Sequence, residues 1–126
     1  MNVLLDTCAL LALASGGLPP AAAAALRAAP EASVSVVSPW EVAIKVAGGR
    51  LRIEAPAVQW FLGLAERYAL REIPLDARLV CAAAALPLIH RDPFDCVLVA
   101  LARADALTVL TSDEHIPKYP GVKALW

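Results

Sequence analysis

Four acidic residues stand at positions where their carboxylates could act together: Asp6, Glu41, Asp95 and Asp113. Each follows an apolar, strand-like run or begins a helix-like run. In a fold that alternates strands and helices, such positions lie along one edge of a parallel sheet and face a shared crevice. Like charges packed together raise one another's pKa values, and a divalent cation is the usual reason for a protein to tolerate them. The pattern therefore predicts metal-dependent chemistry on phosphates.

Each acid also has a simpler explanation, which is that it caps a helix. Asp6 and Asp113 are placed to accept hydrogen bonds from helix N-termini. Residues 38–41 (S-P-W-E) and 92–95 (D-P-F-D) both have the form of a capping box. The first residue of each segment would be the N-cap, the proline would be the first residue of the helix, and the acid would be its third. Capping alone does not require the acids to share one sheet edge, and three inferred strands deliver them to the same end. We therefore expect capping and metal binding to coexist.

The elements that would position these acids alternate along the chain. Apolar and β-branched runs predict strands, and longer runs bounded by Gly, Pro or Asp predict helices. The order implies an α/β fold in which a mostly parallel sheet is covered on both faces, within a single domain of residues 1–126. The predicted strands cover residues 2–5, 33–37, 72–75, 107–110 and 122–126, and the predicted helices cover residues 8–14, 21–29, 39–46, 56–70, 77–86 and 93–104.

Composition narrows the possible partners and locations of the protein. The chain is 60% hydrophobic, with a mean hydropathy of +0.63, and this apolar surplus favours an oligomer or a bound partner. No run reaches the roughly 18 apolar residues that span a bilayer, and the N-terminus lacks the basic start of a signal peptide, so we expect a cytoplasmic protein. A net charge of −1 argues against a broad basic surface for nucleic acid. Contacts with nucleic acid would therefore be confined to a local site.

Several motifs, taken in order, resemble those of PIN-domain proteins, and specifically VapC-type toxins of toxin–antitoxin pairs. They are residues 3–7 (V-L-L-D-T), 38–45 (S-P-W-E-V-A-I-K), 90–95 (H-R-D-P-F-D) and 111–113 (T-S-D). The C-terminal residues 119–126 add to the resemblance, which covers essentially the whole chain. The W-E-V-A-I-K and H-R-D-P-F-D segments at this spacing are its most specific part.

The resemblance implies a three-layer α/β/α fold and an endoribonuclease that depends on Mg²⁺ or Mn²⁺. The family's catalytic acids map by position onto Asp6, Glu41, Asp95 and Asp113. Asp6 and Asp95 would bind the metal directly, while Glu41 and Asp113 would bind a second metal or its waters. The implied partners are an RNA substrate, a cognate antitoxin protein and a second copy of the chain in a homodimer. A PIN module that binds RNA or protein without cleaving it is the alternative.

Two cysteines depart from the family pattern. Cys8 stands where members often have a basic or imidazole residue, and Cys96 stands where arginine is common. Each could offer a thiolate to a softer metal ion, or could be a small buried residue. With Cys81 they make an odd number without C-x-x-C spacing, so neither a disulfide framework nor a zinc knuckle is expected.

Other residues near the acids are predicted to be structural. His90 precedes a turn, where a lone histidine usually lies at the surface or in a hydrogen bond, so we place it outside the catalytic set. The three tryptophans, Trp40, Trp60 and Trp126, are predicted to be packing residues rather than platforms on which bases stack. Lys45 lies four residues after Glu41, a spacing suited to an ion pair on one helix face. A haloacid dehalogenase-type phosphatase is disfavoured because its second aspartate would have to stand at Cys8.

Overall fold

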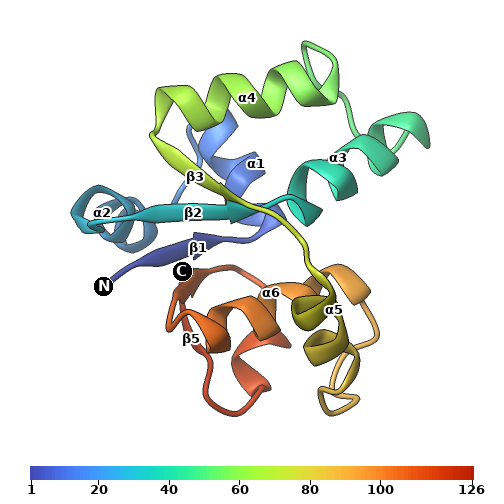
Figure 1. The fold of residues 1–126 in the computed structure, drawn as a ribbon. Coiled ribbons are helices and arrows are strands. Elements are labelled where there is room, and N and C mark those ends of the chain that lie inside the picture. The colour runs from blue at the N-terminus through green and yellow to red at the C-terminus, as the bar shows by residue number, and fades with distance from the viewer.

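The computed structural model describes residues 1–126 and contains one wholly parallel, five-stranded sheet (Figure 1). The strand order is β3-β2-β1-β4-β5, so the first strand of the chain lies in the middle. The predicted parallel sheet in an α/β fold is therefore confirmed. The strands are β1 (Val3–Leu5), β2 (Ala32–Ser35), β3 (Leu70–Ile73), β4 (Thr108–Leu110) and β5 (Lys123–Leu125).

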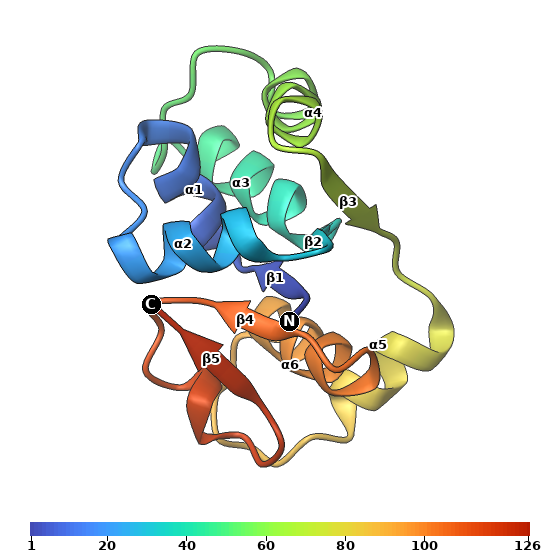
Figure 2. The same cartoon turned by 90° about the vertical axis from the view of Figure 1, so that its left-hand side faces the viewer.

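Helices cover both faces of this sheet, as the three-layer prediction requires. In Figure 2, α1 and α4 lie on one side of the sheet, and α5 and α6 lie on the other. Helix α3 starts at the carboxyl end of β2 and contacts α1, α4 and α6. The helices are α1 (Thr7–Ser15), α2 (Pro20–Ala28), α3 (Val37–Ala47), α4 (Ala57–Arg67), α5 (Ala77–Ala84) and α6 (Pro93–Ala104), followed by a 3₁₀ turn, η1 (Ile116–Lys118).

The central strand divides its side chains between two hydrophobic cores. Val3 and Leu5 pack in a cluster with residues of α1, α2 and α4, whereas Leu4 packs in a second cluster with residues of α5, α6 and η1. Successive residues of a strand point to opposite faces, so a strand covered on both sides must be apolar throughout. This explains why the N-terminal run has no polar alternation before Asp6.

Most predicted helix boundaries lie within two residues of the observed ones, and α6 agrees at both ends. The clearest differences lie at the second and third strands. β3 begins at Leu70, two residues before the predicted start, and β2 ends at Ser35 instead of residue 37. The Val36 N–H donates to the carbonyl of Ile73, and the Val37 N–H donates to Ser35 Oγ, so the chain turns directly from strand into helix.

No single helix is long and apolar enough to cross a membrane. The consecutive helices α1 and α2 satisfy the length and composition criteria only as a pair, with a bend of 97° between them. In this structure α1 buries Ala9, Leu10 and Leu13 against the sheet.

Candidate metal centre

The acids approach one another at the carboxyl edge of the sheet. Asp6 directly follows β1, Asp113 follows the neighbouring strand β4, and Asp95 lies in the first turn of α6. One ligand atom from each of His90, Asp95 and Asp113 lies within 4.8 Å of the other two. The expected convergence is therefore present for Asp95 and Asp113, in a group that includes a histidine that the sequence reasoning left out, and Thr111 links Asp6 to Asp113 at the same edge.

Asp6 is both a helix cap and a buried acid. Its Oδ1 accepts a hydrogen bond from the Ala9 N–H at 2.7 Å, and its Oδ2 accepts one from the hydroxyl of Thr111. Only 3% of the residue is exposed. Burial raises the pKa of Asp6 from 3.8 to about 6, against the effect of these two hydrogen bonds, and the charges of Asp113 and Glu41 raise it further.

Ionisation of Asp95 is even less favourable than ionisation of Asp6. Its Oδ2 lies 3.2 Å from His90 Nε2. Burial raises the pKa of Asp95 from 3.8 to about 8, with further contributions from the negative charges of Asp92 and Asp113. Asp6 and Asp95 both resist ionisation, so a nearby positive charge is needed for both to be anionic at once. A divalent cation would supply such a charge.

Asp113 is fixed by local hydrogen bonds at the start of the turn that leads to η1. Its N–H donates to Thr111 Oγ1 at 2.9 Å, and its Oδ1 accepts from the His115 N–H at 2.6 Å. The short helical turn expected after this residue exists as the 3₁₀ turn η1. Thr111 thus holds two of the acids, because its hydroxyl also donates to Asp6.

Glu41 is not the capping-box acid that the sequence predicted. Helix α3 starts at Val37 without a side-chain cap, so Glu41 lies beyond the first turn. Its Oε1 accepts from the Thr7 hydroxyl at 2.7 Å, and its Oε2 forms an ion pair with Lys45 Nζ at 2.8 Å, which confirms the expected i,i+4 pair. Its charge reaches Asp6, but Glu41 is not part of the close group around Asp95.

The second predicted cap, at α6, has the expected form at its N-cap. Asp92 Oδ1 accepts from the Phe94 N–H at 2.9 Å, and Pro93 is the first helical residue. Ser38, the residue corresponding to Asp92 in α3, is instead buried with its hydroxyl 3.2 Å from that of Thr7. The capping-box prediction therefore fails at α3, because that helix begins two residues earlier than expected.

The two unusual cysteines differ in their surroundings. Cys8 is exposed and Cys96 is half-buried, so neither is the small buried residue that the sequence allowed. Partial desolvation of the Cys8 thiol, together with the charge of Asp6, raises its pKa, which disfavours a metal-binding thiolate. Cys96 Sγ lies 3.7 Å from the carbonyl oxygen of His90 and 3.8 Å from the Tyr119 hydroxyl. Cys96 thus contacts the backbone behind His90.

Two aromatic residues adjoin the acids in the chain, Trp40 and Phe94. None of the three tryptophans is fully buried, since Trp40 and Trp126 are exposed and only Trp60 is partly buried against the core. Trp40 precedes Glu41 and is 54% exposed. Its ring lies edge-on to that of Phe94, which precedes Asp95, with 5.1 Å between the ring centroids. The side chain therefore presents an indole to solvent beside the acidic group.

Sequence reasoning missed the position of His90. The sequence does place His90 five residues before Asp95, and this proximity was the available signal. The intervening chain has no helical or strand period, so spacing alone could not tell which way the imidazole points. Its Nε2 faces Asp95, while the ring stacks on His115 with 4.5 Å between centroids.

The donor set fits a divalent cation. Carboxylate oxygens are the ligands of Mg²⁺ and Mn²⁺, and imidazole nitrogen is a common ligand of first-row transition ions. Asp95 and Asp113 supply oxygens and His90 supplies a nitrogen, and Asp6 lies close enough for its charge to act on Asp95. Such an ion would also compensate the mutual repulsion of the acids.

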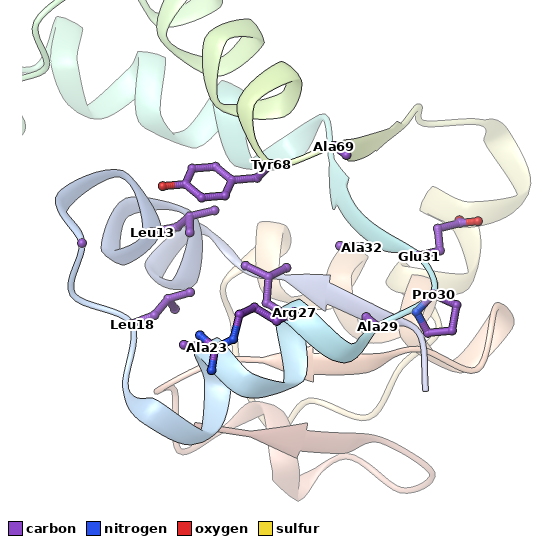
Figure 3. A pocket seen from close by; sticks show the side chains of 12 residues that line it. Leu13, Leu18, Ala23, Arg27, Ala29, Pro30, Glu31, Ala32, Tyr68 and Ala69 are labelled. Carbon is purple, nitrogen blue, oxygen red and sulfur yellow. The ribbon is translucent and has the colours of Figure 1, made fainter.

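The molecule also has an apolar pocket of about 610 Å³ away from these acids, shown in Figure 3. Its walls include Leu13, Leu18 and Tyr68, together with residues just before β2 and β3. The starts of parallel strands lie at the opposite edge from their carboxyl ends, so this pocket lies away from the metal centre. Its acid, Glu31, pairs with Arg71 at 2.6 Å.

Comparison with known proteins agrees with this architecture. The PIN domain family model matches residues 3–122, whereas no curated protein matches the chain significantly. Similar solved structures include VapBC2 from Rickettsia felis bound to a promoter DNA fragment (TM-score 0.73, 13% identity, 99% of this chain and 98% of that chain). A toxin–antitoxin complex from Klebsiella pneumoniae (0.67, 22%, 95% and 94%) and DNA-bound VapBC from Salmonella typhimurium (0.68, 13%, 99% and 97%) are also similar. Because the family model matches nearly the whole chain, the chain belongs to the PIN-domain family.

Proposed function

We propose that this protein is a metal-dependent endoribonuclease that hydrolyses RNA phosphodiester bonds with Mg²⁺ or Mn²⁺ at its acidic centre. The observation that carries the proposal is the convergence of Asp6, Asp95 and Asp113 at the carboxyl edge of the sheet in a PIN-domain chain. The raised pKa values of Asp6 and Asp95 support it, because they mark a site in which the charges are uncompensated.

We assign different roles in metal binding to the four acids. In this proposal Asp6 and Asp95 bind it directly, and Asp113 and Glu41 hold a second ion or the surrounding waters. A bound divalent cation supplies a water of lowered pKa and offsets negative charge in the transition state. Thr111 and the Ala9 N–H keep the carboxylate of Asp6 in a fixed orientation. Lys45 and Thr7 do the same for Glu41, so little reorganisation is needed when substrate arrives.

The exposed ring of Trp40 supports RNA with unpaired bases as the substrate. An indole beside the acids can stack on a base, which is possible only where that base is free of a duplex. The chain's net charge of −1 also favours local contacts over a broad electrostatic surface. Trp40→Ala should therefore raise KM for single-stranded RNA by about tenfold, consistent with the 1–3 kcal/mol typical of base stacking.

The biological role that we propose is that of a cytoplasmic toxin neutralised by an antitoxin protein. The similar structures from Rickettsia felis, Klebsiella pneumoniae and Salmonella typhimurium are toxin–antitoxin complexes, which supports a protein partner for this chain as well. Exposed apolar side chains offer surface for such a partner and for a homodimer. They include Ile44 on α3, and Val58 and Leu62 on α4.

The test is cleavage of single-stranded RNA, tRNA and rRNA by the purified protein with Mn²⁺ or Mg²⁺, beside EDTA and the Asp95→Asn variant. The proposal predicts cleavage that requires the metal and is lost in the variant. If the wild-type protein binds RNA and leaves it intact with either metal, the alternative of a non-catalytic PIN module is correct. Cleavage by Asp95→Asn at the wild-type rate would show that the acidic centre has been assigned wrongly.

A further inference from the structure

We infer that His90 is a protein ligand of the cation that Asp95 binds, with Asp113 beside it, and that its imidazole makes this position select Mn²⁺ over Mg²⁺. The inference deepens the proposed function and rests on it for the presence of a divalent cation. The three side chains offer ligand atoms that all lie within 4.8 Å of one another. They bring two carboxylates and one nitrogen to a single point from the loop before α6, from α6 and from the segment after β4.

The backbone of His90 is fixed by two hydrogen bonds to the hydroxyl of a buried side chain. The His90 N–H donates to the Tyr119 hydroxyl at 3.0 Å, and the His90 carbonyl accepts from the same hydroxyl at 3.4 Å. Tyr119 is only 1% exposed and belongs to the core beneath α6. A buried tyrosine from 29 residues further along the chain therefore fixes the position from which the imidazole reaches the acids.

The ring itself is also constrained. It stacks on the ring of His115 with an interplanar angle of 12°, and its Nε2 lies 3.2 Å from Asp95 Oδ2. His115 is fixed in turn, because its N–H donates to Asp113 Oδ1. The His90 side chain is 27% exposed, so one side of the ring remains accessible from solvent. A ligand whose position and ring plane are set beforehand loses little entropy when a metal binds.

The nitrogen donor determines the preferred class of metal. Mg²⁺ favours an octahedron of oxygen ligands and keeps several waters, whereas imidazole suits first-row transition ions. A site with only the two carboxylates would distinguish Mn²⁺ from Mg²⁺ weakly. Adding His90 gives a mixed nitrogen and oxygen set, which stabilises Mn²⁺ more than Mg²⁺.

The direct test is the Mn²⁺ electron spin-echo envelope modulation spectrum of the metal-free full-length protein loaded with one equivalent of Mn²⁺. The chain has two histidines, His90 and His115, so labelling histidine with ¹⁵N identifies any imidazole bound to the ion. We expect a ¹⁴N coupling in the unlabelled protein that becomes a ¹⁵N coupling after labelling. This measurement needs no substitution and does not depend on RNA cleavage.

Two matched variants separate a ligand from a positioning residue. His90→Gln should abolish the nitrogen coupling and weaken Mn²⁺ binding by about tenfold or more, while changing Mg²⁺ binding by less than about twofold. His115→Gln removes the stacked ring but no ligand, so it should retain the coupling. Titration calorimetry with each metal gives the affinities, and circular dichroism checks that both variants fold.

The inference is overturned if Mn²⁺ bound to the wild-type protein shows no nitrogen coupling. It is also overturned if His90→Gln weakens Mg²⁺ and Mn²⁺ binding equally, since His90 would then only orient Asp95. Failure of the proposed function looks different, because RNA would stay intact while the coupling was still observed. A protein that binds neither metal would contradict both.

Discussion

The two segments that combine a proline, an aromatic residue and an acid meet in the structure, yet they hold their acids in different electrostatic surroundings. Residues 38–41 lie in α3 and residues 92–95 begin α6, and the rings of Trp40 and Phe94 touch edge to face. Glu41 already has a cation and a hydroxyl donor, from Lys45 and Thr7. Asp95 is buried near the negative charges of Asp92 and Asp113.

The cause of this difference is where each helix begins. In α6, proline is the first helical residue and Asp92 caps it, so Asp95 remains in the first turn. In α3 the helix starts at Val37, and Glu41 is displaced onto the face that meets Thr7 and Lys45. The same local pattern thus produces one acid that is paired within the protein and one that is left for an external cation.

The largest expected effect is on catalysis. Asp95→Asn should lower the rate of metal-dependent RNA cleavage by at least about a hundredfold, since it removes a proposed direct ligand, whereas Glu41→Gln should lower it less. Single-turnover cleavage with Mn²⁺ measures both rates. Equal losses of cleavage rate in the two variants would mean that Asp95 and Glu41 contribute equally to catalysis, despite their different surroundings.

A second effect concerns the stability of the metal-free protein. An acid whose folded-state pKa is raised holds its proton more tightly when folded, so stability falls as pH rises from its unfolded pKa to its folded pKa. For Asp6 that window runs from about pH 4 to 6, and for Asp95 it extends to about pH 8. Asp95→Asn should therefore stabilise the metal-free protein at pH 8 by on the order of 2 kcal/mol.

Urea unfolding in EDTA at pH 5 and pH 8 measures this difference. Glu41→Gln is the matched control, and it should give no gain at pH 8, because its carboxylate is already paired with Lys45. If the difference in stability between Asp95→Asn and the wild-type protein were the same at pH 8 as at pH 5, the assignment of Asp95 as the uncompensated acid would be wrong.

A third effect links metal to the same comparison. A Mn²⁺ concentration of about 100 times the Kd measured at pH 8 should stabilise the folded protein by about 2.7 kcal/mol at that pH. The same concentration should stabilise it less at pH 5, where protons compete with the cation. Thermal unfolding with and without Mn²⁺ checks this. A gain that Asp95→Asn leaves unchanged would place the ion elsewhere.

The smallest effect should come from Lys45→Met, which removes the partner of Glu41. The ion pair lies on a helix face and the Lys45 side chain is 37% exposed, so the loss should be only about 0.5 kcal/mol. Unfolding at low and high salt tests the value, since the difference between variant and wild type should shrink with added salt. A loss of several kcal/mol would show that Glu41 depends on Lys45 far more than the geometry indicates.

Much of the fold could be predicted because the signals are local. Apolar runs, Ala-rich stretches and Pro or Gly breaks define the alternating elements, and the position of Asp6 after β1 follows from that order. The end of β2 could not be predicted, because Val36 and Val37 are β-branched residues typical of a strand, yet the Val37 N–H donates to Ser35 Oγ and begins α3. The helix was therefore expected to start later than it does, and the cap predicted at Ser38 was wrong.

The candidate site was only partly visible in the sequence. Strand ends brought Asp6 and Asp113 together, and helix chemistry placed Asp92 and Asp95. The orientation of His90 depends on Tyr119, whose hydroxyl reaches it from a distant segment. Such a contact leaves no periodic or compositional trace, so no pattern in the loop could reveal it.

The hydrogen bond from Thr111 to Asp6 joins residues that are 105 positions apart, and it has a consequence for protein synthesis. Asp6 leaves the ribosome 105 residues before its partner hydroxyl on Thr111, and Asp113 follows Thr111. Until β4 pairs with β1, the acids have no common edge on which to assemble. A nascent or truncated chain without β4 therefore carries the first carboxylates but not the centre, and any activity of that centre begins only after β4 and Asp113 have been made.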